Sequence, residues 1–174
     1  MVQLSGWSNF YVVVGSSAGA LIGLQFVVIA LISTIRAQTA AAGARAYATP
    51  TIVFFSTVLL TAALLSIPHQ SRSRIGVELL VIGLAGTMYV ARVGRHIRLV
   101  EQYIPDRGDW MWFLVLPTMA YVALFVSGAL MWSSPGTALD VVGASELLLL
   151  FVGVHNAWDG AVYMVVNPSG SQAD

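Results

Sequence analysis

The chain has 174 residues, of which 57% are hydrophobic and only 9% are charged, and its formal net charge is zero. This composition is too apolar for a water-soluble globular domain, and the charge balance does not suggest nucleic-acid binding. The absence of cysteine excludes disulfides, thiolate metal sites and cysteine nucleophiles. The sequence therefore predicts one all-α domain over residues 1–174, a polytopic bundle of transmembrane helices with lipid as its main solvent.

Apolar stretches follow one another along the chain, and each is long enough to cross about 30 Å of hydrocarbon as a helix. The five expected spans cover residues 10–35, 50–67, 75–93, 111–132 and 139–166. Thr49-Pro50 predicts an N-cap followed by proline at the first helical position of the second span. Pro117 predicts a kink in the fourth span, and Thr137 with Asp140 predicts a capping box at the start of the fifth.

The arginine residues favour one orientation of this bundle. Most of them follow the first and third spans, at positions 36, 45, 95, 98 and 107. The opposite side carries only Arg72 and Arg74, between the second and third spans. Because cytoplasmic loops are enriched in Lys and Arg, we expect the N-terminus outside and the C-terminus in the cytoplasm.

The first span carries small residues on one face. Gly15, Gly19 and Gly23 recur every four residues, so another backbone can approach this face closely. Two interpretations stay open. The face packs tightly within its own subunit, or it forms a contact between subunits of an oligomer.

The fifth span contains the densest polar cluster expected at membrane depth. His155 and Asp159 are four residues apart and share a helix face, and Asn156 lies on a neighbouring face. Arg92 lies at a similar depth in the third span, so we expect an Arg92–Asp159 ion pair. The cluster is either a structural latch or part of a proton or ion pathway.

Two further carboxyl groups lie near the outer ends of their spans. Glu78 and Glu146 have similar shallow depths, and if they converge they can attract a cation or share one proton. Arg74 precedes Glu78 by four residues, and an ordinary ion pair on one helix is the simpler explanation of Glu78. Glu146 has no such local cation, which makes it the more informative residue.

The motifs that usually identify an enzyme are absent, including G-x-S-x-G, H-E-x-x-H, the P-loop and the dinucleotide fingerprint. We therefore do not expect an enzyme, and we assign no catalytic residue, metal ligand or cofactor. His69 and His96 fall on opposite sides of the expected membrane, which argues against a bis-histidine haem site within one subunit.

Short motifs spread over most of the chain give it a family likeness. They are Trp7-x-x-Phe10, then Gly15, Ala18, Leu21, Gly23-Leu24 and Phe26, then Thr49-Pro50-Thr51, then Asp109-Trp110 with Pro117, and finally Val154-His155-Asn156-Ala157-Trp158-Asp159. With these motifs the chain resembles a family of small bacterial multi-pass inner-membrane proteins of uncharacterised function. The resemblance implies a bacterial inner-membrane location and carries over no functional residue.

Two functions are the main interpretations of this pattern, and a third, an intramembrane enzyme with His155 and Asp159 as acid and base, needs a substrate-sized cavity that reaches both. The first is a homo-oligomeric channel or permease-like protein for a small ion or a proton, because buried ionisable groups accompany a face suited to assembly. Its candidate pathway residues are Glu146, His155, Asp159, Arg92, Glu78 and Asn156. The alternative is a non-conducting accessory or scaffold subunit that binds another membrane protein through the Gly15/Gly19/Gly23 face. Besides such partners we expect the lipid bilayer, and no nucleic acid.

Overall fold

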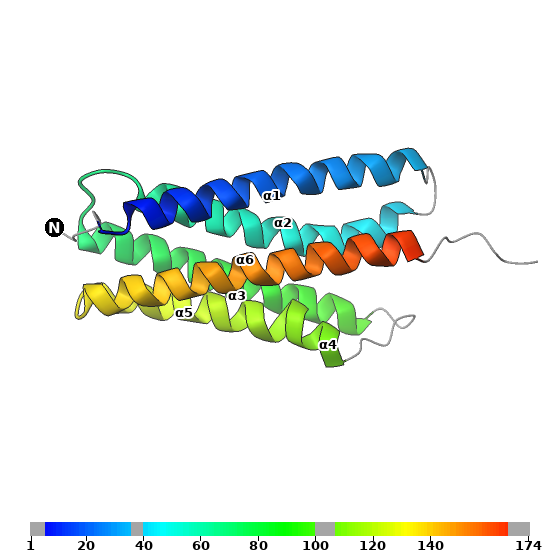
Figure 1. The fold of residues 1–174 in the computed structure, drawn as a ribbon. Coiled ribbons are helices and arrows are strands. Elements are labelled where there is room, and N and C mark those ends of the chain that lie inside the picture. Colours follow the sequence, from blue (N-terminus) through cyan, green and yellow to red (C-terminus); the bar gives the residue numbers. More distant parts are fainter. Residues whose placement is uncertain (1–5, 36–39, 100–106, 167–174) are drawn as a thin grey trace, which may run out of the picture.

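The computed structural model describes residues 6–35, 40–99 and 107–166, and every regular element in them is helical. The elements are α1 (Ser8–Ile35), α2 (Ala40–Leu65), α3 (Arg72–Leu99), α4 (Arg107–Trp110), the π-helical turn η2 (Met111–Val115), α5 (Leu116–Leu130) and α6 (Pro135–Val166). The five long helices lie side by side along one axis (Figure 1). The all-α prediction is confirmed.

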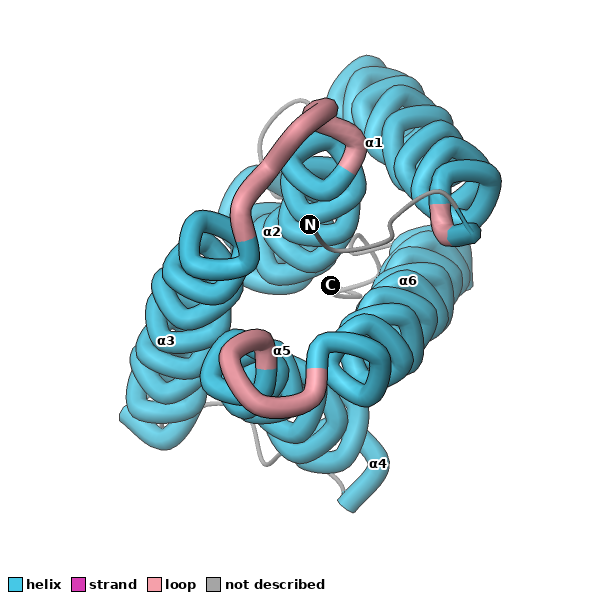
Figure 2. Tube along the Cα trace, turned by 90° about the vertical axis from the view of Figure 1, so that its left-hand side faces the viewer, coloured by secondary structure: helices cyan, strands magenta, loops and turns pink. Residues whose placement is uncertain are grey.

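The helices are not equivalent in their positions. Figure 2 shows α2, α3, α5 and α6 around a common centre, with α1 on the outside against α2 and α6. α5 lies between α3 and α6, and these two neighbours make the most extensive contacts of α5. Residues from every long helix contribute to the core, including Val14, Phe54, Leu79, Leu124 and Leu149.

Four helices, α1, α3, η2 with α5, and α6, contain segments long and apolar enough to cross a membrane. The apolar part of α2, Thr49–Leu65, is shorter and lies at the lower limit of about 17 residues for a span. Large apolar side chains cover the outer faces, with Val13, Leu24 and Phe151 more than half exposed. Such an outer surface suits lipid, since a soluble monomer rarely exposes continuous apolar faces.

Several predicted boundaries are wrong. α2 begins ten residues before Pro50, which therefore lies inside the helix and not at its first turn. The segment ahead of Pro50 is rich in alanine, the strongest helix former, and this composition favours an earlier start. Thr137 likewise lies inside α6. The Ser134 carbonyl accepts the first helical hydrogen bond, from the Ala138 N–H at 2.9 Å, so Ser134 is the N-cap and Pro135 the first helical residue.

The closest backbone approach that glycine creates is between α3 and α5. A Cβ atom built on Gly83 would lie 2.4 Å from the Phe125 backbone nitrogen, and one on Gly128 would lie 2.8 Å from the Gly76 carbonyl oxygen. These positions admit no larger residue without a shift of backbone. In lipid, such close packing replaces the hydrophobic effect as the force that joins helices. A hydrogen bond of 2.9 Å between the Thr57 and Tyr121 hydroxyls adds a polar link between α2 and α5.

Candidate functional site

A buried carboxyl group without a partner lies on the inward face of α6. Glu146 is 0% exposed, and neither of its carboxyl oxygens has a hydrogen-bond partner. The Tyr11 hydroxyl on α1 is also buried and without a partner, and it lies within electrostatic range of Glu146. These two groups form what we call the Glu146–Tyr11 site. Buried polar groups are normally hydrogen-bonded, so two unpaired groups close to one another are unusual.

The register between α1 and α6 explains why the two residues meet. Gly143 on α6 leaves room for the Trp7 ring, because a Cβ atom there would lie 2.8 Å from it. Both helices run in the same direction from this end of the bundle (Figure 1). One further turn along each helix reaches Tyr11 and the neighbourhood of Glu146.

Aromatic rings cover the site at the end of the bundle where α1 begins. Trp7 stacks on Tyr11 with 6.1 Å between ring centroids, and it meets Phe10 edge-on at 5.5 Å. Trp7 and Phe10 are half-buried, and Tyr11 is 2% exposed. The cluster separates Glu146 from this end of the bundle.

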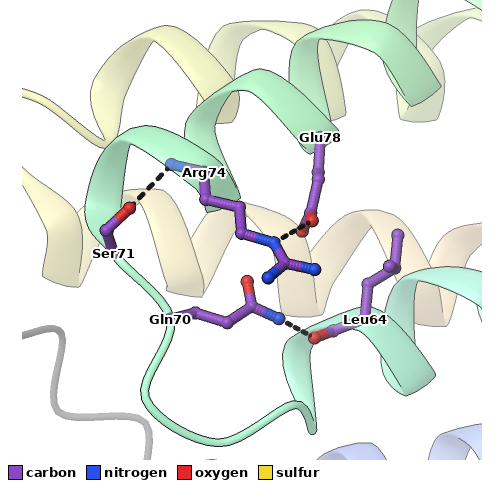
Figure 3. A network of polar contacts seen from close by, with 5 residues as sticks. All are labelled: Leu64, Gln70, Ser71, Arg74 and Glu78. Carbon is purple, nitrogen blue, oxygen red and sulfur yellow. Dashed lines mark hydrogen bonds and ion pairs between the residues drawn. The ribbon is translucent and has the colours of Figure 1, made fainter.

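Glu78 belongs to a different environment. The Arg74 Nε donates to Glu78 Oε1 at 2.9 Å, within a polar network at the start of α3 that also includes Gln70, Ser71 and the Leu64 carbonyl (Figure 3). Arg74 is exposed, and the second oxygen of Glu78 is buried without a hydrogen bond. Of the two explanations expected for Glu78, an ion pair with Arg74 or a site shared with Glu146, the structure has the simpler one, the ion pair. Nothing in the described residues joins Glu78 to Glu146.

His155 and Asp159 share a helix face, as predicted. His155 Nδ1 lies 3.1 Å from Asp159 Oδ2, and the His155 ring stacks on Trp112 with centroids 3.6 Å apart. The Asp159 side chain is 56% exposed and is not a core group. The expected Arg92–Asp159 ion pair is wrong: Arg92 is exposed, and α5 separates its helix from α6.

Asn156 joins α6 to the π-helical turn. Its Nδ2 donates to the Trp112 carbonyl oxygen at 3.5 Å, while Oδ1 is buried without a partner. The Leu116 N–H bonds the Met111 carbonyl instead of that of Trp112, and Pro117 has no N–H to offer. Asn156 thus donates to a carbonyl that these two helix residues leave without a backbone donor. The sequence predicts a kink at Pro117, and the structure has the π-helical turn Met111–Val115 directly before Leu116 and Pro117.

The candidate residues therefore fall into separate groups. Glu146 and His155 are nine positions apart on α6, which places them about 14 Å apart along the axis and half a turn around it. Of the predicted glycines, Gly15 packs against Ala62, whereas a Cβ atom at Gly19 or Gly23 would have no other atom within 4 Å. Tyr11 was not predicted, because a tyrosine near a helix start is typical of an interfacial anchor.

The Glu146–Tyr11 site offers acid–base chemistry and little else. It brings one carboxyl group and one phenol together away from solvent. Within the described segments, no three His, Asp or Glu side chains gather closely enough to hold a metal ion. A buried carboxyl in an apolar bundle commonly marks a proton or ion pathway.

No family model, curated protein or solved structure matches the chain. The resemblance to small bacterial membrane proteins stays a prediction.

Proposed function

We propose that the protein moves protons or another small cation across the bacterial inner membrane, with Glu146 as the group that binds them. One observation carries this proposal: Glu146 is completely buried and both of its oxygens lack a hydrogen-bond partner. An unpaired carboxyl is costly in a helix bundle, and such groups commonly occur where a substrate ion binds.

The proposal includes five spans, with the N-terminus outside and the C-terminus inside. The alternating directions of the five long helices support it, since α1 begins and α6 ends at opposite ends of the bundle (Figure 1). α1 and α3, which the arginine-rich segments follow in the sequence, end at the same end of the bundle, which we assign to the cytoplasm. The Glu146–Tyr11 site then lies in the outer half of the membrane.

The test is ion flux in liposomes that contain the purified protein. We expect Glu146→Gln to abolish the flux, because the amide has no negative charge to attract a cation and no acidic proton to release. Asp140→Asn is the matched control, since Asp140 is an exposed carboxyl on the same helix, and it should leave the flux unchanged. Asp159→Asn should also have no effect, because the His155–Asp159 pair lies on the other side of α6. Equal flux in wild type and Glu146→Gln would reject the proposal.

A second candidate function is a non-conducting accessory subunit that binds another membrane protein through α1. The outside position of α1 and the open space beside Gly19 and Gly23 favour it. The same face would serve a homo-oligomer, the assembly expected for a channel.

Copurification from native membranes separates these possibilities. Gly19→Leu should remove a partner that binds through α1, because the leucine keeps another backbone away. Gly136→Leu is the control, since Gly136 on α6 also has nothing within 4 Å. Loss of a different protein, in a chain without ion flux, supports the accessory subunit. Loss of a second copy of this chain supports the homo-oligomer.

A further inference from the structure

The charges around Glu146 decide which cation the site can hold. α1, α2, η2 and α5 pack against α6, so these elements must provide any partner for its carboxyl group. α1, η2 and α5 contain no Lys, Arg or His, and α2 contains Arg45 alone. Gly15 packs against Ala62 of α2, close to the site, and Arg45 lies about 25 Å from Ala62 along that helix. The described helices bring no positive charge to Glu146.

The ionisable groups on α6 itself and those closest on the neighbouring helices have other environments. On α6 itself Asp140 is exposed, and His155, about 14 Å along the axis and on the opposite face of the helix, stacks on Trp112. Arg74 on α3 pairs with Glu78. Tyr11 on α1 lies within electrostatic range of Glu146 and is itself uncharged as a phenol, and Tyr121 on α5 bonds Thr57 instead. None of these groups neutralises a carboxylate at position 146.

The oxygen supply is too small for a metal cation. Hard cations such as Mg²⁺ and Ca²⁺ take about six to eight oxygen ligands. The site has the Glu146 carboxyl and the Tyr11 hydroxyl. The neighbouring buried Ser145 hydroxyl donates to the Val141 carbonyl of its own helix and Thr61 on α2 donates to the Thr57 carbonyl, but both keep an oxygen that could coordinate a cation. Even with these two hydroxyls, four groups with five oxygens fall short of the shell of such an ion.

We infer that the ligand of the Glu146–Tyr11 site is a proton, and that Glu146 is a neutral carboxylic acid in the resting bundle. Proton uptake forms an O–H bond on one carboxyl oxygen and removes the negative charge, and release breaks that bond. Without a cation beside the carboxyl group, neutralisation by a proton is the way to avoid an isolated buried charge. The inference rests on the proposed function only for the movement of the proton.

Infrared spectroscopy of the protein in liposomes tests the charge of Glu146 directly. The difference spectrum between wild type and Glu146→Gln at neutral pH should contain the C=O stretch of a protonated carboxylic acid. The matched difference with Asp140→Asn should contain carboxylate bands instead, because Asp140 is exposed. Should Glu146→Gln fail to fold, Glu146→Asp keeps the acid, and its band should move without disappearing.

Two results would overturn the inference. One is that Glu146→Gln removes carboxylate bands, as Asp140→Asn does. The other is that Na⁺ or K⁺, added at fixed pH in place of choline, converts the acid band into carboxylate bands. Flux measured on the same liposomes separates this inference from the proposed function. An acid band without flux would reject transport and support a protonated Glu146. Carboxylate bands with sodium-dependent flux would support transport and reject the proton as the ligand.

Discussion

At the scale of single residues, two buried tyrosines differ in one respect. The Tyr121 hydroxyl is bonded to Thr57 at 2.9 Å, whereas the Tyr11 hydroxyl has no hydrogen-bond partner. Loss of a net hydrogen bond costs about 1 kcal/mol, and removal of an unpaired buried hydroxyl costs little or even stabilises. We therefore expect Tyr121→Phe to lower the free energy of unfolding by about 1 kcal/mol, and Tyr11→Phe to leave it unchanged or raise it.

Thermal unfolding in detergent measures both variants against wild type. Thr57→Val is the control for Tyr121→Phe, since it removes the other hydroxyl of the same hydrogen bond. A clear loss of stability in Tyr11→Phe would mean that its hydroxyl is paired, and Glu146 would be the first partner to examine.

Sequence reasoning identified Glu146 and missed Tyr11 for the same physical reason. A residue's neighbours along its own helix are visible in the sequence, and Glu146 stood out because no arginine lies four positions away. Tyr11 comes from another helix, and its position depends on how Trp7 fits against Gly143. The Arg92–Asp159 prediction failed similarly, because equal depth on two helices does not make those helices neighbours.

At the scale of helices, glycine positions differ sharply in what they can accommodate. A side chain at Gly83 would meet the Phe125 backbone, while one at Gly19 would meet nothing within 4 Å. Overpacking a tight site costs about 1–3 kcal/mol, and α3 and α5 cannot yield without backbone movement. Gly83→Ala should therefore lower the free energy of unfolding by about 1–3 kcal/mol or more. Gly19→Ala should be neutral or slightly stabilising, because alanine is the better helix former.

Unfolding of the two alanine variants under the same conditions gives the comparison. The sequence pointed to the regular spacing of Gly15, Gly19 and Gly23, yet the structure places the tightest glycine contacts on α3 and α5. Spacing shows which residues share a face, but only the packing of the partner helix shows which face is used. Equal effects at Gly19 and Gly83 would contradict this assignment.

The π-helical turn makes a second prediction at this scale. If Asn156 replaces a backbone donor that Pro117 lacks, then Asn156→Ala should cost about 1 kcal/mol in wild type. The cost should be smaller in a Pro117→Ala background, where the restored N–H can bond a carbonyl of the preceding turn. A double-mutant cycle on unfolding free energies measures this coupling. Additive effects would show that the two residues act independently.

At the scale of the whole molecule, the sequence predicted the helical class and the order of the long helices, because apolar length is visible in the chain. The starts of helices were less accurate. An N-cap followed by proline does not begin a helix at Thr49-Pro50, whereas Ser134-Pro135 begins α6 in this way. The alanine-rich segment before Pro50 outweighs the local signal, because helix propensity adds up over many residues.

The short apolar part of α2 makes the number of membrane crossings the main question about the whole chain. The absence of cysteine means that single introduced cysteines report on one position each. α1 and α6 begin at the same end of the bundle (Figure 1). If α2 crosses, Asn9→Cys near the start of α1 and Ser133→Cys just before α6, both exposed, should react with an impermeant maleimide in intact cells. Gly108→Cys, exposed near the start of the helical segment that leads into α5, should react only after permeabilisation. If α2 does not cross, Asn9→Cys and Ser133→Cys lie on opposite sides, and only one of them reacts from outside.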